Sequence, residues 1–138
     1  MEKLRIGVIG LGIGRAHIRG FREHPGAEIV AIADPNKERL HEVKTEYAVP
    51  NAYESASDML AGEELDVVSV ATPNAYHSEL TIEALKAGCH VLCEKPMALH
   101  AKEAEKMLAA AKKYNRRLMI NFSYRFTEQS WALKQEVE

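Results

Sequence analysis

Short apolar runs alternate with amphipathic, charged stretches along the 138 residues of the chain. The strongest apolar runs are continuous, which is typical of strands in a parallel sheet that is buried on both faces. Strands that alternate with helices form right-handed βαβ units. The sequence therefore predicts an α/β fold, a doubly wound and mainly parallel sheet in three α/β/α layers, with the strand order 3-2-1-4-5-6. Strands are expected at 4–9, 28–33, 51–53, 66–71, 89–93 and 117–122, with helices at 13–23, 36–46, 55–60, 74–87 and 100–114.

Composition and charge exclude several classes of protein. Hydrophobic residues make up 46% and charged residues 28% of the chain, as in an ordinary globular domain. The 18 basic and 20 acidic residues give a net charge of −2, which is unsuited to tracking a nucleic-acid backbone. No apolar run reaches the ~18 residues that a membrane span needs, and the N-terminus does not resemble a signal peptide. We therefore expect a cytoplasmic protein of about one domain, with neither nucleic acid nor membrane as partner.

Two cysteines, Cys89 and Cys93, raise the question of a disulfide or a metal site. On one strand they would lie ~13 Å apart at ~3.3 Å per residue, which is too far for a disulfide. His90 would point to the opposite face of that strand, so the three side chains cannot converge on one ion. We expect no disulfide and no metal site.

A glycine cluster joins the first predicted strand to the first predicted helix. A side chain at Gly10 or Gly12 would keep a phosphate away from the backbone, and the positive end of the helix favours a diphosphate. The spacing departs from G-x-G-x-x-G, because Gly14 comes one residue early and Arg15 takes the usual third position. The alternative is a tight turn without a ligand, but the strand–helix context favours a dinucleotide.

Asp34 ends the second predicted strand and supports the same interpretation. A carboxylate at this place can accept hydrogen bonds from both ribose hydroxyls of an adenosine, and it repels a 2′-phosphate. NAD is therefore the expected cofactor. NADP stays open as an alternative, because Lys37 and Arg39 lie just beyond Asp34 and can reach a 2′-phosphate if they are not simply a solvated helix face.

Two polar segments follow later strands, at the sheet edge where ligands bind in this class of fold. Thr72 to His77 follow strand 66–71, and the alternative to cofactor contact is that Asn74 caps a helix. Glu94-Lys95-Pro96 follows strand 89–93. A lysine in a cleft can act in proton transfer, a neighbouring glutamate can orient it, and a proline after it makes a cis peptide a candidate. The alternative is a polar surface turn.

Taken together, these segments resemble the Gfo/Idh/MocA family of oxidoreductases, which includes glucose–fructose oxidoreductase and inositol dehydrogenase. The resemblance implies a Rossmann fold over residues 1–126 that binds NAD(P) and belongs to a dehydrogenase acting on the CH–OH group of a sugar or polyol. The segments that carry it are IGVIGLGIGRAH at 6–17, AIADPN at 31–36, ATPNAYH at 71–77, AGCHVLCEKPM at 87–97 and NFSYRF at 121–126.

The resemblance also implies roles for single residues. Lys95 is expected to be catalytic, close to the nicotinamide and the reacting hydroxyl, with Glu94 beside it. Asn121 and Arg125 are expected to face the cleft between cofactor and substrate. The full set expected to bind the dinucleotide is Gly10, Gly12, Ile13, Gly14, Asp34, Thr72, Pro73, Asn74, His77, Glu94, Lys95, Asn121 and Arg125.

Family members carry a C-terminal substrate domain and a D-x-x-x-H segment, for which this sequence has no counterpart. Residues 127–138 are expected to begin a helix that leads to such a domain. Hydride transfer needs both reactants in near-attack geometry, so we expect the chain to bind the dinucleotide but to turn over a sugar or polyol only when a C-terminal domain is supplied. Trp131, Leu133 and Val137 form an apolar pattern whose partner is that domain or a second copy, which would make a homo-oligomer.

Two other functions stay open from the sequence. One is a regulatory module that binds a dinucleotide without catalysis. The other is a methyltransferase-like domain that binds S-adenosylmethionine, since such folds also use a glycine turn and an acidic residue after the second strand. Glu94-Lys95-Pro96 argues against the second.

Overall fold

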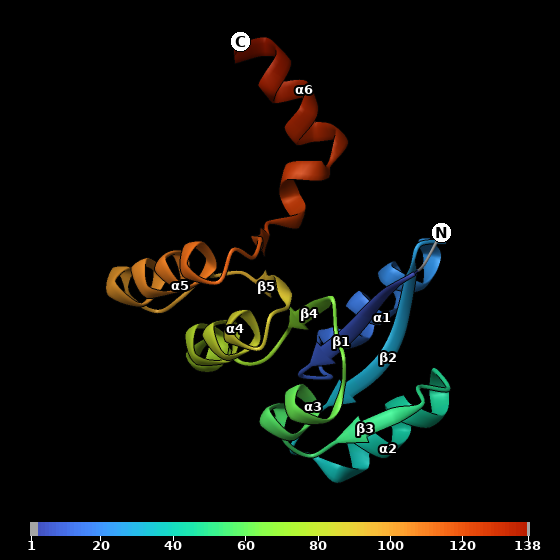
Figure 1. Ribbon diagram of the computed structural model, residues 1–138. Coiled ribbons are helices and arrows are strands. Elements are labelled where there is room, and N and C mark those ends of the chain that lie inside the picture. Colours follow the sequence, from blue (N-terminus) through green and yellow to red (C-terminus); the bar gives the residue numbers. More distant parts are fainter. Residues whose placement is uncertain (1–2, 138) are drawn as a thin grey trace.

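The computed structural model describes residues 3–137, in which strands and helices alternate as the sequence predicts (Figure 1). Short 3₁₀ helices, η1 and η2, follow β4 and β6. The elements are β1 (Leu4–Ile9), α1 (Gly14–Glu23), β2 (Ala27–Ala33), α2 (Lys37–Glu46), β3 (Asn51–Tyr53), α3 (Ala56–Gly62), β4 (Val67–Val70), η1 (Asn74–Tyr76), α4 (His77–Lys86), β5 (His90–Glu94), α5 (Ala101–Lys113), β6 (Leu118–Asn121), η2 (Ser123–Phe126) and α6 (Glu128–Val137).

The strands form one six-stranded sheet in the order β3-β2-β1-β4-β5-β6. Every neighbouring pair is parallel, so the predicted doubly wound topology is confirmed. The chain leaves β1 toward one edge of the sheet and returns to β4 on its other side. This reversal places a switch point between β1 and β4, where the carboxyl ends of the strands leave a crevice.

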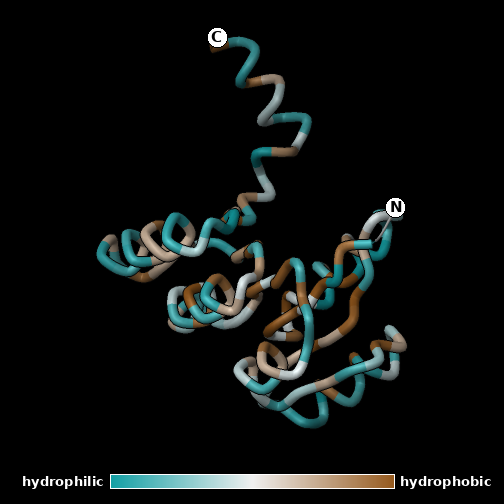
Figure 2. Tube along the Cα trace, viewed as in Figure 1, coloured by the Kyte–Doolittle hydropathy of each residue, from teal (hydrophilic) through white to brown (hydrophobic). Residues whose placement is uncertain are grey.

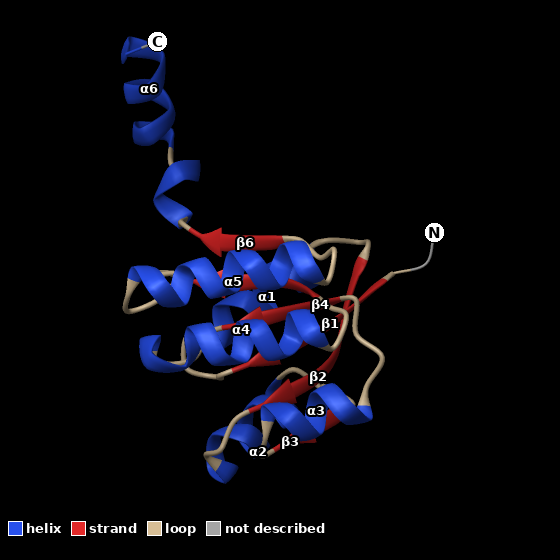
Figure 3. Ribbon diagram, turned by 60° about the vertical axis from the view of Figure 1, so that its left-hand side comes forward, coloured by secondary structure: helices blue, strands red, loops and turns tan. Residues whose placement is uncertain are grey.

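Two apolar clusters lie on the two faces of the sheet and account for the continuous apolar runs. On one face, Ile6 and Val8 of β1 pack with Ile18 of α1 and Leu40 of α2. On the other face, residues of β2, β4 and β5 pack with α3, α4 and α5, and Met107 is fully buried there. Figure 3 shows the strands between helices, and Figure 2 shows the hydrophobic residues gathered at the centre. The three-layer prediction is therefore correct.

The half of the sheet formed by β4, β5 and β6 is less completely covered. Helices α4 and α5 pack on one of its faces, whereas on the other α1 packs against β4 and reaches Glu94 of β5 only through His17. Met119 of β6, which lies beside Leu92 of β5, is consequently half-exposed. Helix α6 extends away from the sheet in Figure 1, and its Trp131, Leu133 and Val137 are exposed.

Particular residues set the starts of α3 and α4 and the buried face of α1. Ser55 caps α3, because its hydroxyl accepts a hydrogen bond from the Asp58 N–H. Asn74 does not cap α4: it begins η1, and α4 starts three residues later without a side-chain cap. At the start of α1, the apolar Ile13 is exposed, whereas the polar His17 is buried. His17 turns inward because the sheet offers polar partners there.

Among residues 3–137, no helix is both long and apolar enough to cross a membrane.

Candidate functional site

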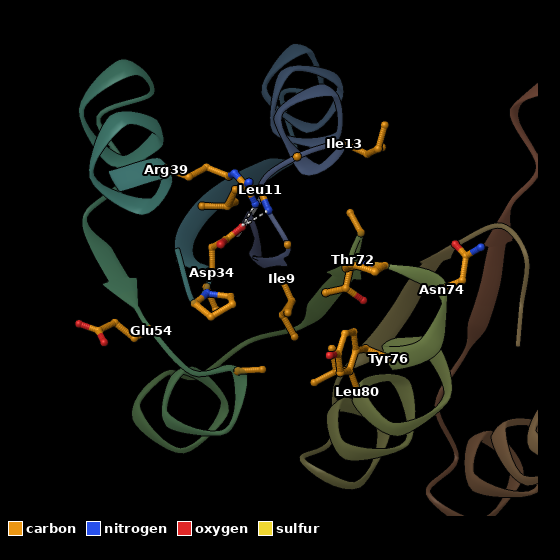
Figure 4. A pocket seen from close by; sticks show the side chains of 17 residues that line it. Ile9, Leu11, Ile13, Asp34, Arg39, Glu54, Thr72, Asn74, Tyr76 and Leu80 are labelled. Carbon is orange, nitrogen blue, oxygen red and sulfur yellow. Dashed lines mark hydrogen bonds and ion pairs between the residues drawn. The ribbon is translucent and has the colours of Figure 1, made fainter. Parts of the chain in front are cut away.

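A cleft of about 700 Å³ opens at the switch point between β1 and β4 (Figure 4). One wall comes from the turn after β1 and the residues after β2, and the other from the segment after β4. In Figure 4, Asp34, Arg39 and Leu11 lie together on one side, opposite Thr72, Tyr76 and Leu80. The lining residues are Ile9, Gly10, Leu11, Gly12, Ile13, Ala33, Asp34, Pro35, Arg39, Glu54, Ala56, Ala71, Thr72, Pro73, Asn74, Tyr76 and Leu80.

Each glycine of the turn after β1 has a different physical role. Gly10 has a φ of +85°, and a Cβ there would lie 2.7 Å from the Ala71 backbone oxygen. A Cβ on Gly14 would lie 3.0 Å from Val8 Cγ1, so this glycine lets α1 approach the sheet although it comes one residue early. A Cβ on Gly12 would meet nothing within 4 Å. A side chain at Gly12 would therefore leave the fold intact but stand over the cleft side of the turn.

The arginine at the usual third-glycine position has a place outside the cleft. Arg15 bonds Glu42 at 2.9 Å and Glu46 at 2.8 Å, both on α2. These partly exposed ion pairs join α1 to α2. The departure from the standard spacing therefore does not obstruct the glycine turn.

Asp34 lies at the cleft wall with only 2% of its surface exposed, and it is already well bonded. Its Oδ2 accepts hydrogen bonds from the Leu11 N–H at 2.8 Å and from Arg39 at 3.2 Å. Its Oδ1 accepts the Asn36 N–H at 2.8 Å. A carboxylate has about four acceptor positions, so about one remains for a ribose hydroxyl. Binding both hydroxyls would require Arg39, which is partly exposed, to move aside.

Unpaired polar atoms in the cleft test whether a dinucleotide fits. Within the described residues, Thr72 Oγ1 is buried without a hydrogen-bond partner, although it lies on the cleft wall. The Gly12 and Ile13 N–H groups, just before α1, likewise have no acceptor within residues 3–137. Buried polar groups are normally paired, and N–H groups at a helix start favour an anion. The turn and Thr72 thus fit a ligand that carries a diphosphate.

His77 was expected to line the dinucleotide, but the structure places it beneath the cleft. Its side chain is fully buried at the start of α4. Nδ1 lies 2.7 Å from the Pro96 carbonyl oxygen, and Nε2 lies 2.9 Å from the Thr72 carbonyl oxygen. His77 therefore braces two loops at the site from below.

A second polar cluster lies at the carboxyl ends of β4, β5 and β6, and two of its members, His17 and Ser69, were not expected from the sequence. His17 Nε2 lies 2.8 Å from Glu94 Oε1, and Nδ1 lies 2.6 Å from Ser69 Oγ. Asn121 donates to the same Glu94 oxygen at 2.6 Å. His17 follows Gly14 by three residues and so shares its buried helix face, which is the signal that could have identified it.

Glu94 is held as a carboxylate by this cluster. Burial acts to raise its pKa, but hydrogen bonds from Asn121 and His17, the His17 charge and the Lys95 N–H together bring the pKa below its usual value. Its Oε2 accepts the Lys95 N–H at 3.1 Å. Lys95 itself is exposed, and the bond between Lys95 and Pro96 is cis, as the sequence suggested.

Ser69, His17 and Glu94 contact one another in the order of a hydrolase triad, but the serine is not accessible to a substrate. Ser69 is fully buried, so its hydroxyl cannot reach a substrate carbonyl.

Cys89 and Cys93 are both free and buried, and burial raises the pKa of the Cys93 thiol to about 11. Within residues 3–137, no three His, Cys, Asp or Glu side chains are placed to hold a metal ion.

The structure brings most of the expected site residues together, but not all. The glycine turn, Asp34 and the segment 72–74 line the cleft, and Asn121 joins Glu94 at its polar cluster. Arg125 lies apart: it is exposed in η2 and borders a separate hollow with Met119 and Phe126. Its expected contact with the cofactor stays a prediction that this arrangement does not support.

A parallel doubly wound sheet, a glycine turn at its switch point and an acidic residue after β2 define a Rossmann-type domain that binds dinucleotides. The sequence profile described as "Oxidoreductase family, NAD-binding Rossmann fold" (GFO_IDH_MocA) matches residues 4–122. The chain belongs to this family and forms its NAD-binding domain. The methyltransferase-like alternative is not favoured by this match.

Relatives of known activity and structure agree with the assignment. The chain is 37% identical to a myo-inositol 2-dehydrogenase of Thermotoga maritima and 33% identical to a D-glucoside 3-dehydrogenase of Escherichia coli, over 98% and 97% of its length. It spans 41% and 39% of those two proteins. The crystal structure of the Bordetella pertussis WlbA dehydrogenase with NADH and UDP-GlcNAcA matches with a TM-score of 0.95 and 33% identity, covering 99% of this chain and 42% of that one.

Proposed function

We propose that this chain forms the cofactor-binding part of a dehydrogenase that acts on the CH–OH group of a sugar or polyol. The observation that carries the proposal is the arrangement of the two polar sites along one sheet edge. The glycine turn and Thr72 offer unpaired donors in the cleft. Glu94 and Lys95 lie at the carboxyl end of β5, the strand that pairs with β4. The two relatives named above, an inositol and a glucoside dehydrogenase, support this substrate class.

In the proposed complex, the diphosphate lies over Gly10 to Gly14 and the adenosine ribose lies against Asp34. Thr72, Pro73 and Asn74 form the opposite wall, which leads the other end of the dinucleotide toward Glu94 and Lys95. The bound nicotinamide would supply the hydride acceptor or donor. Asp34, buried and negatively charged, favours NAD over NADP because it repels a 2′-phosphate.

Lys95 is the proposed catalytic residue. Its backbone is bonded to Glu94, while its side chain is exposed at the sheet edge. From that place it can bind the reacting hydroxyl and hold or accept its proton. Within residues 3–137, the Lys95 side chain is exposed and no opposing wall excludes water there. We infer that a further domain after residue 126 completes the substrate pocket, and that residues 127–138 lead toward it.

Two further features belong to the same proposal. Both cysteines are free, which supports a reducing, cytoplasmic environment. In a solution of this chain alone, a second copy would cover the exposed apolar residues Trp131, Leu133 and Val137. Sedimentation of the wild type and the Trp131→Glu variant is expected to show a monomer–dimer equilibrium that the variant shifts toward monomer. An unchanged monomer in both would contradict self-association.

Fluorescence titration followed by a turnover assay tests the main proposal. NADH is expected to bind, NADPH to bind about tenfold more weakly or worse, and S-adenosylmethionine not to displace NADH. Myo-inositol and glucosides are expected to reduce NAD only when a C-terminal domain is supplied. Failure to bind NADH, or displacement by S-adenosylmethionine, would overturn the proposal. Turnover of a polyol by this chain alone would contradict the need for a second domain.

A further inference from the structure

Two buried histidines hold the backbone on either side of Lys95. His17 belongs to the first turns of α1, and His77 is the first residue of α4. The His17 side chain is 5% exposed, and His77 is completely buried. Both rings use both nitrogens in contacts with other elements, so each one is fixed in orientation.

On the N-terminal side of Lys95, the contacts run through Glu94. His17 Nε2 meets Glu94 Oε1 at 2.8 Å, and the other carboxylate oxygen accepts the Lys95 N–H at 3.1 Å. Asn121 adds a second donor to Oε1 at 2.6 Å. Without His17, the partly buried carboxylate would lose one of its donors and the restraint on its orientation. The position of the Lys95 amide therefore depends on a residue of α1.

On the C-terminal side, the contact is made to Pro96. His77 Nδ1 lies 2.7 Å from the Pro96 carbonyl oxygen. The opposite nitrogen, Nε2, lies 2.9 Å from the carbonyl oxygen of Thr72, which lines the cofactor cleft. A single ring thus connects the segment after β4 to the segment after β5.

Each histidine is also connected to one wall of the cofactor cleft, although neither lines it. His17 lies one turn along α1 from Gly14, at the end of the glycine turn, and His77 Nε2 lies against the Thr72 carbonyl oxygen on the opposite wall. Any rearrangement of either wall is carried to a residue next to Lys95. Because buried hydrogen bonds are costly to break, these contacts favour one relative placement of the cleft and the lysine.

We propose that His17 and His77 are positioning residues that clamp Lys95 at a fixed place relative to the cofactor cleft, so that the nicotinamide end of the dinucleotide meets a pre-arranged surface. This inference rests on the proposed place of Lys95 beside the nicotinamide. Neither histidine touches the cofactor in this scheme. They act through Glu94 and Pro96.

Asparagine and glutamine substitutions separate the clamp from a general packing role, because their amides replace different ring nitrogens. At position 17, Gln reaches toward the place of Nε2 and can bond Glu94, whereas Asn reaches only toward that of Nδ1. At position 77 the order is reversed: Asn can bond Pro96, whereas Gln reaches toward Thr72. The clamp therefore predicts that His17→Gln and His77→Asn are mild, and that His17→Asn and His77→Gln are damaging.

Two measurements on the whole chain read out the clamp. The first is the affinity for NADH compared with ADP-ribose, which lacks the nicotinamide. The second is hydrogen exchange at the Lys95 amide compared with the Val8 amide in the buried sheet. His17→Asn and His77→Gln are expected to weaken NADH about fivefold or more while ADP-ribose changes less than about twofold. Lys95 exchange should accelerate in both, with Val8 unchanged. His41→Asn, an exposed change on α2, is the control and should alter neither.

The outcomes distinguish the clamp from the function on which it rests. Equal weakening of NADH and ADP-ribose, or the same response to Asn and Gln at each position, would overturn the clamp. Wild-type chain that binds ADP-ribose as tightly as NADH would overturn it too, while leaving the cofactor cleft in place. Wild-type chain that binds neither ligand would contradict the proposed function itself. The Asn and Gln variants keep polar groups in place, and Val8 exchange identifies any variant that loses the fold as a whole.

Discussion

The two halves of the sheet edge are built differently. Around β1 and β2, the glycine turn, Asp34 and the start of α2 bond one another and enclose one side of a cleft. Around β5 and β6, Glu94 and Asn121 are well bonded, but Lys95 and Arg125 are exposed and α6 extends outward. The first half therefore has the parts of a cofactor site, whereas the second offers one wall of a substrate site. Binding and turnover should accordingly respond to different changes.

The largest effect is expected at Gly10. Gly10→Ala places a Cβ 2.7 Å from the Ala71 backbone and forces an alanine to a φ of +85°. We expect a loss of stability of about 2–4 kcal/mol, because both the clash and the backbone strain act together. Thermal unfolding measures it, and a stability within error of the wild type would contradict the geometry of the turn.

Gly12→Ala is the matched control in the same turn and should separate binding from folding. Its Cβ meets nothing within 4 Å, so the stability should change by no more than about 0.5 kcal/mol. The methyl group would stand where the backbone should approach the diphosphate, so NADH affinity is expected to fall about tenfold or more. Calorimetric titration and unfolding on the same sample test both parts. Unimpaired NADH binding would exclude the turn as the diphosphate site.

Asp34→Ala is expected to change cofactor preference more than the fold. It removes the charge that repels a 2′-phosphate and releases Arg39, which bonds Asp34 at 3.2 Å. The NADPH-to-NADH affinity ratio should rise about tenfold. In the double variant with Arg39→Ala, most of that gain should disappear. A ratio that stays at its wild-type value in Asp34→Ala would show that the ribose lies elsewhere.

The smallest effect concerns pH in the second half of the edge. Burial opposes ionisation of Glu94, but hydrogen bonds from Asn121 and His17 outweigh it and keep its pKa below the usual 4.5. A lowered folded-state pKa stabilises the fold above pH 4.5, and this contribution is lost as the pH falls through the folded-state value. The stability difference between wild type and Glu94→Gln should therefore shrink on acidification below pH 4.5. A constant difference from pH 7 to pH 3 would contradict this charge state.

The sequence was most informative where one physical requirement dominates. Burial on both faces forces continuous apolar strands, and close approach at Gly10 forces a glycine, so the sheet order and the turn could be predicted. Asn74 is a residue type that favours capping, but it does not cap α4. Capping depends on local backbone angles that residue type alone does not determine, and here a 3₁₀ turn intervenes. The roles of His77 and His17 could not be predicted, because they depend on which segments of the chain fold against them. Their partners at Pro96 and Glu94 are 19 and 77 residues away in the chain.

The central claim is that the glycine turn and Asp34 together hold the dinucleotide. A crystal structure of the chain with NADH tests it most directly. We predict the diphosphate against the backbone of residues 10–14, the adenosine ribose within hydrogen-bond distance of Asp34, and the nicotinamide directed toward Lys95. NADH bound away from this cleft, or a cleft closed by side chains in the presence of saturating NADH, would contradict it.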